Sequence, residues 1–288
     1  MRNAKQLNQP YQLLGKSEQA EVDRVKWQLL NDLHEAMRDE KLSLYYQPKL
    51  KLSAAPQALD AGCAEALIRW ETDEHGIISP KTTLPLIEHL GSESELIRWL
   101  INTALKKLSE ESAQFPASSI SINVPAASIT TKLLYKIIEE AFSLWDVAAE
   151  RLTLEITEDV LIKDKELAFD YLSKLRERGV RIAIDDFGTG YSSLAYFKHI
   201  PADELKIDQA FISSLLTDEG SRNIVKLVIA LAHSFNLDVV AEGVEDQATL
   251  DMLRQMNCDY AQGFFIAKPT PAAEYNAWLQ KHTTSPHG

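Results

Sequence analysis

The feature that most constrains the fold is a repeated alternation between short apolar strand patterns and amphipathic helix patterns. Eight segments show the alternation and β-branched content of strands, and helical patterns separate most of them. The eight are residues 42–48, 63–70, 119–125, 152–157, 181–187, 204–208, 238–244 and 260–267. This rhythm predicts a largely parallel sheet, and about eight units in 288 residues predict closure into a barrel.

The predicted helices follow one plan. After Asp164, which suits a helix N-cap, apolar residues recur at Leu167, Leu172 and Leu175 until Gly179, which suits the end of a helix. Residues 221–235 and 249–256 repeat the plan. In contrast, residues 49–62 are too short and interrupted for a crossover helix. The first two strands are therefore expected to be antiparallel.

The chain is expected to divide into a lead, a barrel and a tail. Residues 1–38 are a polar lead and an amphipathic helix, with Val25, Leu29, Leu33 and Met37 on one face, which is either a barrel cover or the end of a linker from an upstream domain. Residues 39–282 form the barrel, and the polar residues 283–288 are expected to be disordered. Length alone would also allow two small domains.

Composition excludes several classes of protein. No apolar run approaches the roughly 18 to 20 residues of a membrane span, and the first residues lack a signal-peptide core. The expected location is the cytoplasm, alone or as the cytoplasmic part of a larger membrane or multidomain protein, without membrane contact of its own. Cys63 and Cys258 are expected to be buried free thiols. The net charge of −12 disfavours a nucleic-acid polymer, although metal ions could attract a small anion.

Polar side chains recur at the carboxyl ends of the predicted strands, where barrels of this class carry their active sites. One such carboxylate is as often a helix cap as a ligand, but several that converge favour a metal site. Oxygen ligands of this kind suit Mg²⁺, Mn²⁺ or Ca²⁺ better than Zn²⁺. The residues are Glu65, Asn123, Glu155, Glu158, Asp185, Asp186, Lys206, Glu242 and Gln262.

The adjacent pair Asp185 and Asp186 suggests two ions about 3.5 to 4 Å apart. Strict alternation would send these two side chains to opposite faces, so the backbone must leave strand geometry near Asp186. The next residues, 187–193, are small and polar and include Gly188 and Gly190, which favours a loop that orders on binding over a plain turn. Arg69 could bind a phosphate oxygen or form an ordinary salt bridge.

The chain closely resembles the EAL family over about residues 40 to 270, through several ordered motifs at family-like spacing. They are Glu65-Ala66-Leu67, Asn123, Glu155-Ile156-Thr157-Glu158, Asp185-Asp186-Phe187-Gly188-Thr189-Gly190, Lys206-Ile207-Asp208, Ala241-Glu242-Gly243-Val244-Glu245 and Gln262-Gly263. The resemblance implies an α/β fold, a TIM-like (β/α)8 barrel with an antiparallel first strand. It also implies hydrolysis of the bacterial second messenger cyclic di-GMP to linear pGpG with two Mg²⁺ or Mn²⁺ ions, inhibition by Ca²⁺, and a homodimer.

The resemblance also implies a role for each residue. The implied metal ligands are Glu65, Asn123, Glu155, Asp185 and Asp186; the catalytic residues are Glu65, Lys206 and Glu242; the substrate contacts are Gln47, Leu67, Arg69 and Gln262; and Glu158, Gly188 and Gly190 stabilise the loop.

Two other functions compete with an active phosphodiesterase. The first is a cyclic di-GMP receptor or signalling module with weak catalysis, a role that the resemblance also allows because some members of the family serve as receptors. The second is a Mg²⁺-dependent enolising enzyme, which would need a Lys or His base, and Lys206 is the candidate for it. The complete set of motif residues favours the phosphodiesterase.

Overall fold

The computed structural model describes residues 32–33, 35–36, 41–52, 62–72, 76–116, 118–158, 165–188 and 200–283. These residues form two compact units. The smaller unit comprises residues 1–44 and 68–96, and the larger unit comprises residues 45–67 and 97–288, each within the described ranges. The division falls inside two strands, β1 (Leu42–Lys51) and β2 (Cys63–Thr72), and inside helix α4 (Glu93–Glu110).

The larger unit is built on a closed eight-stranded barrel. Around the ring the strands follow the order β1, β9, β8, β7, β6, β5, β4, β2, and pairing of β1 with β2 closes it. The remaining six strands are β4 (Ser119–Asn123), β5 (Leu152–Thr157), β6 (Arg181–Phe187), β7 (Glu204–Ile207), β8 (Asp238–Ala241) and β9 (Tyr260–Ala261). All eight predicted strands are confirmed, with shorter bounds for β4, β7, β8 and β9.

The direction of the first strand is also as predicted. Neighbouring strands from β2 through β4 to β9 pair in parallel, whereas β1 pairs antiparallel with β9. A short strand that the sequence pattern did not indicate, β10 (Thr270–Pro271), pairs antiparallel with β1 at Tyr45 and Tyr46. Two residues are too few to show an alternation, so this strand exists only through its pairing.

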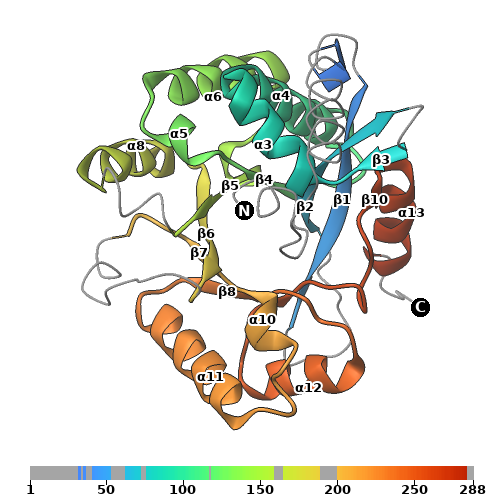
Figure 1. Ribbon diagram of the computed structural model, residues 1–288, viewed down its shortest axis with the longest axis vertical. Helices are drawn as coiled ribbons and strands as arrows, with labels where there is room; N and C mark the ends of the chain where they lie inside the picture. Colours follow the sequence, from blue (N-terminus) through green and yellow to red (C-terminus); the bar gives the residue numbers. More distant parts are fainter. Residues whose placement is uncertain are drawn as a thin grey trace, which may run out of the picture. The chain divides into compact units, whose positions relative to one another are not determined.

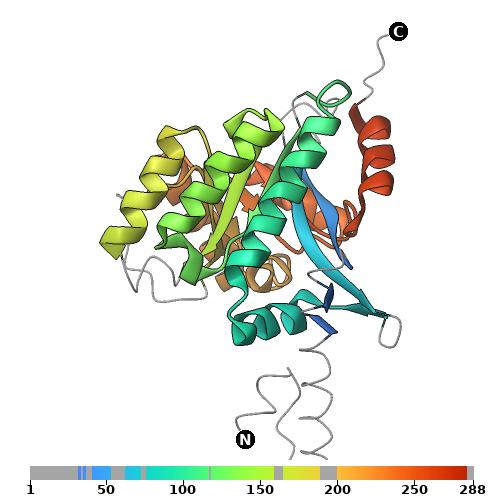
Figure 2. The same ribbon diagram turned by 90° about the horizontal axis from the view of Figure 1, so that it is seen from above.

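Helices surround the ring of strands in the larger unit (Figure 1). Seen from above, α6 and α8 lie side by side along one flank (Figure 2). The elements are α5 (Ala126–Ile129), α6 (Lys132–Trp145), the 3-10 turn η1 (Ala149–Arg151), α8 (Lys165–Glu177), α10 (Gln209–Ile212), α11 (Glu219–Ser234), α12 (Gln247–Gln255) and α13 (Ala272–Thr283). The three predicted helices correspond to α8, α11 and α12. Gly179 follows α8 with a φ of 103°, which fits its predicted role, while Asp164 lies outside the described residues.

Strand β5 alternates between polar and apolar residues. On β5, Leu152, Leu154 and Ile156 are fully buried on one face, whereas Thr153 and Glu155 occupy the other. The polar face points into the ring, because Glu155 bonds to side chains from strands that are not its neighbours. The apolar face lies outward beneath the helices, where burial of each large aliphatic side chain contributes about 1.5 to 3 kcal/mol. On this strand the side that faces the barrel interior is therefore polar.

The smaller unit contains the ends of β1 and β2, a short strand and a helix. Strand β3 (Gly76–Ile78) pairs antiparallel with β2, from Trp70 to Thr72. Helix α3 (Pro80–Leu90) begins with proline at its first position and ends at Gly91, whose φ is 68°. Its Thr83 is buried and donates to the Ser79 carbonyl.

Several predictions fall wholly or partly outside the described residues. Of the predicted N-terminal helix, only residues 32, 33, 35 and 36 are described, and they are helical. Residues 53–61 and 284–288 lie outside the description as well. Both cysteines are free thiols, as predicted; their predicted burial is confirmed for Cys258, whereas Cys63 is partly exposed. Within the described ranges, no helix is both long enough and apolar enough to cross a bilayer.

Candidate active site

The centre of the site is the buried ammonium group of Lys206, on β7 inside the barrel. Its Nζ lies 2.6 Å from Glu155 Oε2, 2.7 Å from Glu242 Oε1 and 3.0 Å from Asp185 Oδ1. Glu65 Oε2 is 3.5 Å away. These carboxylates come from β2, β5, β6 and the residue after β8. The predicted convergence of polar strand ends on one mouth is therefore present.

Two amide side chains bond to Glu65, and a third extends the network. Asn123 Nδ2 donates to Glu65 Oε1 at 2.7 Å, and Gln262 Nε2 donates to Glu65 Oε2 at 2.7 Å. Gln262 Nε2 also lies 3.1 Å from Gln47 Oε1, and Gln47 Nε2 donates to the Ala267 carbonyl at 3.1 Å. The network holds both oxygens of Glu65 in place and ties Gln47 and Gln262 to the same side of the site.

Asp185 and Asp186 lie where the backbone of β6 departs from strand geometry. Asp186 has a φ of 54°, and the pairing of β6 with β7 shifts between Ile184 and Phe187. The Asp186 amide donates to Asp185 Oδ1 at 3.0 Å. The prediction that the backbone leaves the strand near Asp186 is confirmed. As a result, one oxygen each from Asp185, Asp186 and Glu242 lie within 4.8 Å of one another.

This oxygen cluster fits a divalent cation. Three carboxylates at such separations repel one another, and a hard cation such as Mg²⁺ or Mn²⁺ would relieve that repulsion. The repulsion is visible in the pKa values of Glu242 and Asp186. Burial, reinforced by Asp185 and Glu65, raises the pKa of Glu242 to about 8 although Lys206 opposes the shift. Burial and the neighbouring Asp185 and Asp208 likewise raise the pKa of Asp186.

Glu155 behaves in the opposite way to Glu65, although the two carboxylates are close. Burial works against ionisation of Glu155, but Lys206 and Lys49 outweigh it and hold the pKa of this carboxyl at about 2. For Glu65, burial and the charge of Glu155 raise the pKa more than Lys206 lowers it. The site therefore contains one firmly ionised carboxylate and others that gain from an added cation.

Two glycines allow the backbone to place Glu242 and Gln262. A β-carbon on Gly263 would lie 2.1 Å from the Val244 carbonyl oxygen, and one on Gly243 would lie 2.5 Å from Gln209 Cβ. The segments are tied by hydrogen bonds from the Val244 amide to the Gln262 carbonyl and from the Gln262 amide to the Ala241 carbonyl. Only glycine fits at these two close approaches, of Gly263 to Val244 and of Gly243 to Gln209.

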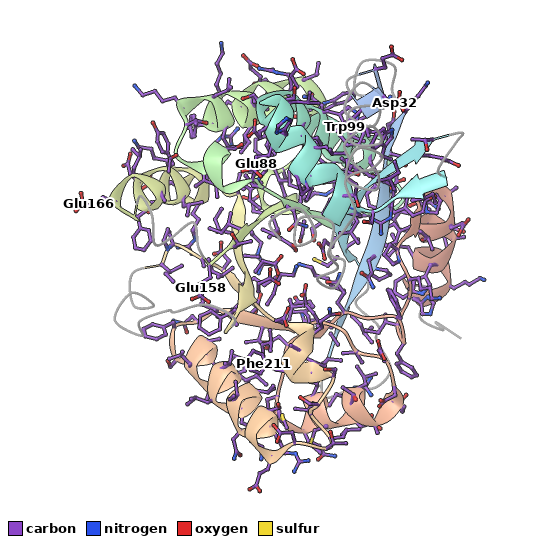
Figure 3. All side chains as sticks on the ribbon, viewed as in Figure 1. Asp32, Glu88, Trp99, Glu158, Glu166 and Phe211 are labelled. Atoms are coloured by element: carbon purple, nitrogen blue, oxygen red, sulfur yellow. The ribbon has the colours of Figure 1, made fainter. Side chains whose placement is uncertain are left out.

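The loop after Asp186 begins against Glu158, which is labelled in Figure 3 and follows β5. Glu158 is buried, and its Oε2 lies 3.4 Å from the Gly188 amide. Gly188 has a φ of 98°, and a β-carbon there would come within 3.0 Å of the ring of Phe211, also labelled in Figure 3. Gly190 lies outside the described residues.

The two remaining predicted substrate contacts are on β2. Leu67 is two residues beyond Glu65 and so shares its face of the strand. Arg69 belongs to the smaller unit, where its Nη1 donates to the Ile68 carbonyl at 2.8 Å. Contact of either residue with a ligand stays a prediction.

The sequence pattern missed three polar residues inside the barrel: Lys49, Ser121 and Glu204. Lys49 Nζ donates to Ser121 Oγ, Glu155 Oε1 and Glu204 Oε1. A signal was present, because Lys49 follows Gln47 by two positions and therefore shares its face of β1. The three partners of Lys49 could not be read from local sequence, because they depend on which strands face one another across the ring.

The fold and the site together define a class: an α/β barrel with a buried lysine and a cluster of carboxylates that could hold a cation at the carboxyl ends of its strands. Known proteins identify the family within this class. The model of the EAL domain family matches residues 30–269, and the chain belongs to this family.

Named relatives share most of this chain. It is 38% identical over 248 residues to the bifunctional diguanylate cyclase/cyclic di-GMP phosphodiesterase MucR of Pseudomonas aeruginosa, covering 86% of this chain and 36% of MucR. It is 35% identical over 256 residues to the cyclic di-GMP phosphodiesterase NbdA of the same species, covering 88% of this chain and 32% of NbdA. The chain thus spans about a third of the length of these relatives.

A solved structure agrees with the fold. The PaMucR phosphodiesterase in complex with c-di-GMP superimposes with a TM-score of 0.81 at 37% identity, covering 86% of this chain and 99% of that one.

Proposed function

We propose that this chain is a phosphodiesterase that hydrolyses cyclic di-GMP to linear pGpG, with Mg²⁺ or Mn²⁺ as cofactor. The observation that carries the proposal is the convergence of Glu65, Glu155, Asp185 and Glu242 on Lys206, with Asp186 beside them. The names of MucR and NbdA support the substrate.

The carboxylates and one amide would hold the metal ions. Glu65, Asn123, Glu155 and Asp185 would hold one ion, and Asp185 with Asp186 would hold a second. When bound, the ions supply positive charge that binds the phosphate and stabilises the transition state. Ca²⁺, which prefers more ligands and longer bonds, is expected to inhibit.

Lys206 and Glu242 are placed to manage the attacking water. A water molecule that replaces their direct 2.7 Å contact would bridge the two groups, with Lys206 as donor and Glu242 as acceptor of its proton. Attack of the water oxygen forms a new bond to phosphorus, and the bond from phosphorus to the 3′ oxygen breaks. The released 3′ oxygen takes up a proton to become the hydroxyl of pGpG.

Other residues would bind the substrate and order the loop. Gln47, Leu67, Arg69 and Gln262 would contact cyclic di-GMP, while Glu158, Gly188 and Gly190 would steady the loop after Asp186. In this proposal residues 39–282 form the catalytic barrel, residues 1–38 are a linker or cover, and the protein acts in the cytoplasm as a homodimer.

The test is hydrolysis of cyclic di-GMP by the purified chain with Mg²⁺, Mn²⁺, Ca²⁺ or EDTA, with products separated by chromatography. We expect pGpG with Mg²⁺ and with Mn²⁺ and none with Ca²⁺ or EDTA. Glu65→Gln should lose more activity than the 10- to 100-fold typical of residues that only support a ligand, with an unchanged circular dichroism spectrum.

Asp203→Asn is the matched control for Glu65→Gln. Asp203 lies just before β7, where it accepts hydrogen bonds from the Ile182 amide and Arg176. The opposite end of the strand carries Lys206, so the control should keep its turnover. Binding of cyclic di-GMP by calorimetry without any product would instead identify a receptor, and equal loss of activity in both variants would argue against the assigned site.

A further inference from the structure

A second lysine is buried in the barrel beneath the site. Lys49, on β1, is fully buried, and its Nζ lies 2.9 Å from Ser121 Oγ, 2.8 Å from Glu155 Oε1 and 2.6 Å from Glu204 Oε1. An ammonium group has three protons to donate. The three contacts use them all, so Lys49 is not available to bind a substrate.

The contacts of Lys49 link four strands across the interior of the larger unit. Ser121 is on β4, Glu155 on β5 and Glu204 on β7. Ser121 and Glu204 each lie two residues before a site residue on the same strand face, Asn123 and Lys206 respectively. Lys49 therefore lies one layer below the mouth of the barrel.

Glu155 is shared between the two layers. Its Oε1 accepts from Lys49 and its Oε2 accepts from Lys206, so each oxygen has a different ammonium partner. The side chain is held at both oxygens, and Oε2 is the one that shares the Lys206 ammonium group with Glu65, Asp185 and Glu242.

The charge of Lys49 is matched by Glu204. The two form a buried ion pair at 2.6 Å, so together they add no net charge beneath the site. Loss of one partner would leave an uncompensated buried charge, whereas loss of both removes a matched pair. Glu204 thus weakens the electrostatic attraction of the Lys49 ammonium group for the Glu155 carboxylate.

We propose that Lys49, with Glu204 as its counter-ion, is a positioning residue for the metal site. Lys49 holds Oε1 of Glu155, so that Glu155 presents one oxygen, Oε2, to a cation. Lys49 acts through Glu155 and touches neither the substrate nor the ion. This inference rests on the proposed function in one respect, the assignment of Glu155 as a metal ligand.

The closing experiment measures Mn²⁺ binding by calorimetry without cyclic di-GMP, and turnover in parallel. The test variant is Lys49→Met with Glu204→Gln, which removes the matched pair. Removal of a group that hydrogen-bonds to a metal ligand typically weakens metal binding by 10- to 100-fold. We expect the Kd for Mn²⁺ to rise by about tenfold or more, with turnover largely recovered at saturating Mn²⁺.

The matched control is Lys107→Met with Glu111→Gln. Lys107 is also buried and paired with a carboxylate, but its other contacts are Asn276 and the rings of Tyr46 and Tyr275. This variant should lower the thermal unfolding midpoint while the Kd for Mn²⁺ stays within about twofold of the wild type. If Lys49 only stabilised the fold, the test variant would likewise show a lower unfolding midpoint and an unchanged Kd for Mn²⁺, which would contradict the proposal.

A single variant tests the counter-ion separately. Glu204→Gln keeps the shape of the side chain and frees the charge of Lys49, which then competes with the cation for Glu155 and should weaken Mn²⁺ binding about tenfold. A folded Glu204→Gln protein with wild-type Mn²⁺ affinity overturns the proposal.

The outcomes separate this proposal from the proposed function. If the wild type binds Mn²⁺ without hydrolysing cyclic di-GMP, the proposed function fails while a weakened variant still supports the positioning role. If the wild type hydrolyses cyclic di-GMP and the variants bind Mn²⁺ equally well, only the positioning role fails. A wild type that binds no Mn²⁺ overturns both.

Discussion

Individual carboxylates in this site differ because of their partners. Glu155 bonds to two ammonium groups, which keep its pKa at about 2 despite complete burial. Glu242 has one ammonium partner and two acidic neighbours, and its pKa is about 8. Similar residues a few ångströms apart can thus serve as a permanent anion and as a group that exchanges protons near neutral pH.

The raised pKa of Glu242 predicts how the stability of the metal-free protein depends on pH. The folded state binds a proton at this carboxyl more tightly than the unfolded state, where the pKa is 4.5. Its contribution to stability is therefore complete below about pH 4.5 and is lost as pH rises to about 8. The raised pKa values of Glu65 and Asp186 act in the same direction.

Urea unfolding in EDTA between about pH 5 and 8 checks this prediction. The midpoint should fall with rising pH, and the fall should be smaller in Glu242→Gln, which has no proton to lose. Saturating Mn²⁺ in place of EDTA should also reduce this fall of the midpoint, since the bound ion replaces the proton. Parallel slopes for wild type and Glu242→Gln in EDTA would show that another group controls the trend.

The sequence predicted most site residues because their placement depends on local rules. Period-two alternation and the position of active sites in barrels brought Glu65, Glu155 and Lys206 to one mouth. Lys49 was missed because its role depends on the pairing of a reversed strand with distant partners. The departure from strand geometry near Asp186 was inferred only because two adjacent carboxylates needed to share a side, and its left-handed φ was not predicted.

At the scale of elements, the loops after β8 and β9 determine where two polar side chains lie. Gly263 packs against the backbone of Val244 at a distance that excludes any β-carbon. A backbone cannot move aside as a flexible side chain can. The close approach therefore couples the position of Gln262 to that of Glu242.

Gly263→Ala should consequently cost about 3 kcal/mol or more, at or above the upper end for overpacking, and should reduce turnover. Gly91→Ala is the control, because Gly91 has a positive φ but nothing within 4 Å of an added β-carbon. It should cost about 1 to 2 kcal/mol through its left-handed backbone and keep its turnover. Urea unfolding and the pGpG assay measure both effects, and equal losses in the two variants would contradict the steric argument.

Element prediction succeeded where the pattern was long. Strands β1, β2, β5 and β6 and helices α8, α11 and α12 carry several periods of their own alternation. Strands β3 and β10 have three and two residues and were not predicted. Such short strands exist because a neighbouring strand offers hydrogen bonds, and that neighbour is not visible in the local sequence.

At the scale of the whole molecule, charge should oppose the proposed substrate. The chain carries a net charge of −12, and cyclic di-GMP is anionic. Long-range repulsion then slows the encounter of the protein with cyclic di-GMP unless salt screens it. Basic proteins, in contrast, attract phosphate ligands. Raising KCl from about 10 to 150 mM shortens the Debye length from about 30 Å to about 8 Å.

We therefore expect kcat/KM for cyclic di-GMP to rise with salt over this range at saturating Mn²⁺, while kcat stays nearly constant. Initial rates of pGpG formation at several substrate concentrations provide the measurement. A decrease in kcat/KM with salt would show that a local cationic field at the mouth dominates over the net charge.

The reversed first strand has a consequence for how the chain folds. Leu50 pairs with Ala261 and Lys51 with Tyr260, so the seam of the ring joins segments roughly two hundred positions apart. Bringing such distant segments together carries a large loop-closure entropy and slows folding. Lys49, on the same strand, likewise finds its carboxylate partners far along the chain, on β5 and β7. Closure of the ring and assembly of the charged interior are thus one cooperative event, and it can happen only after nearly the whole barrel has been synthesised.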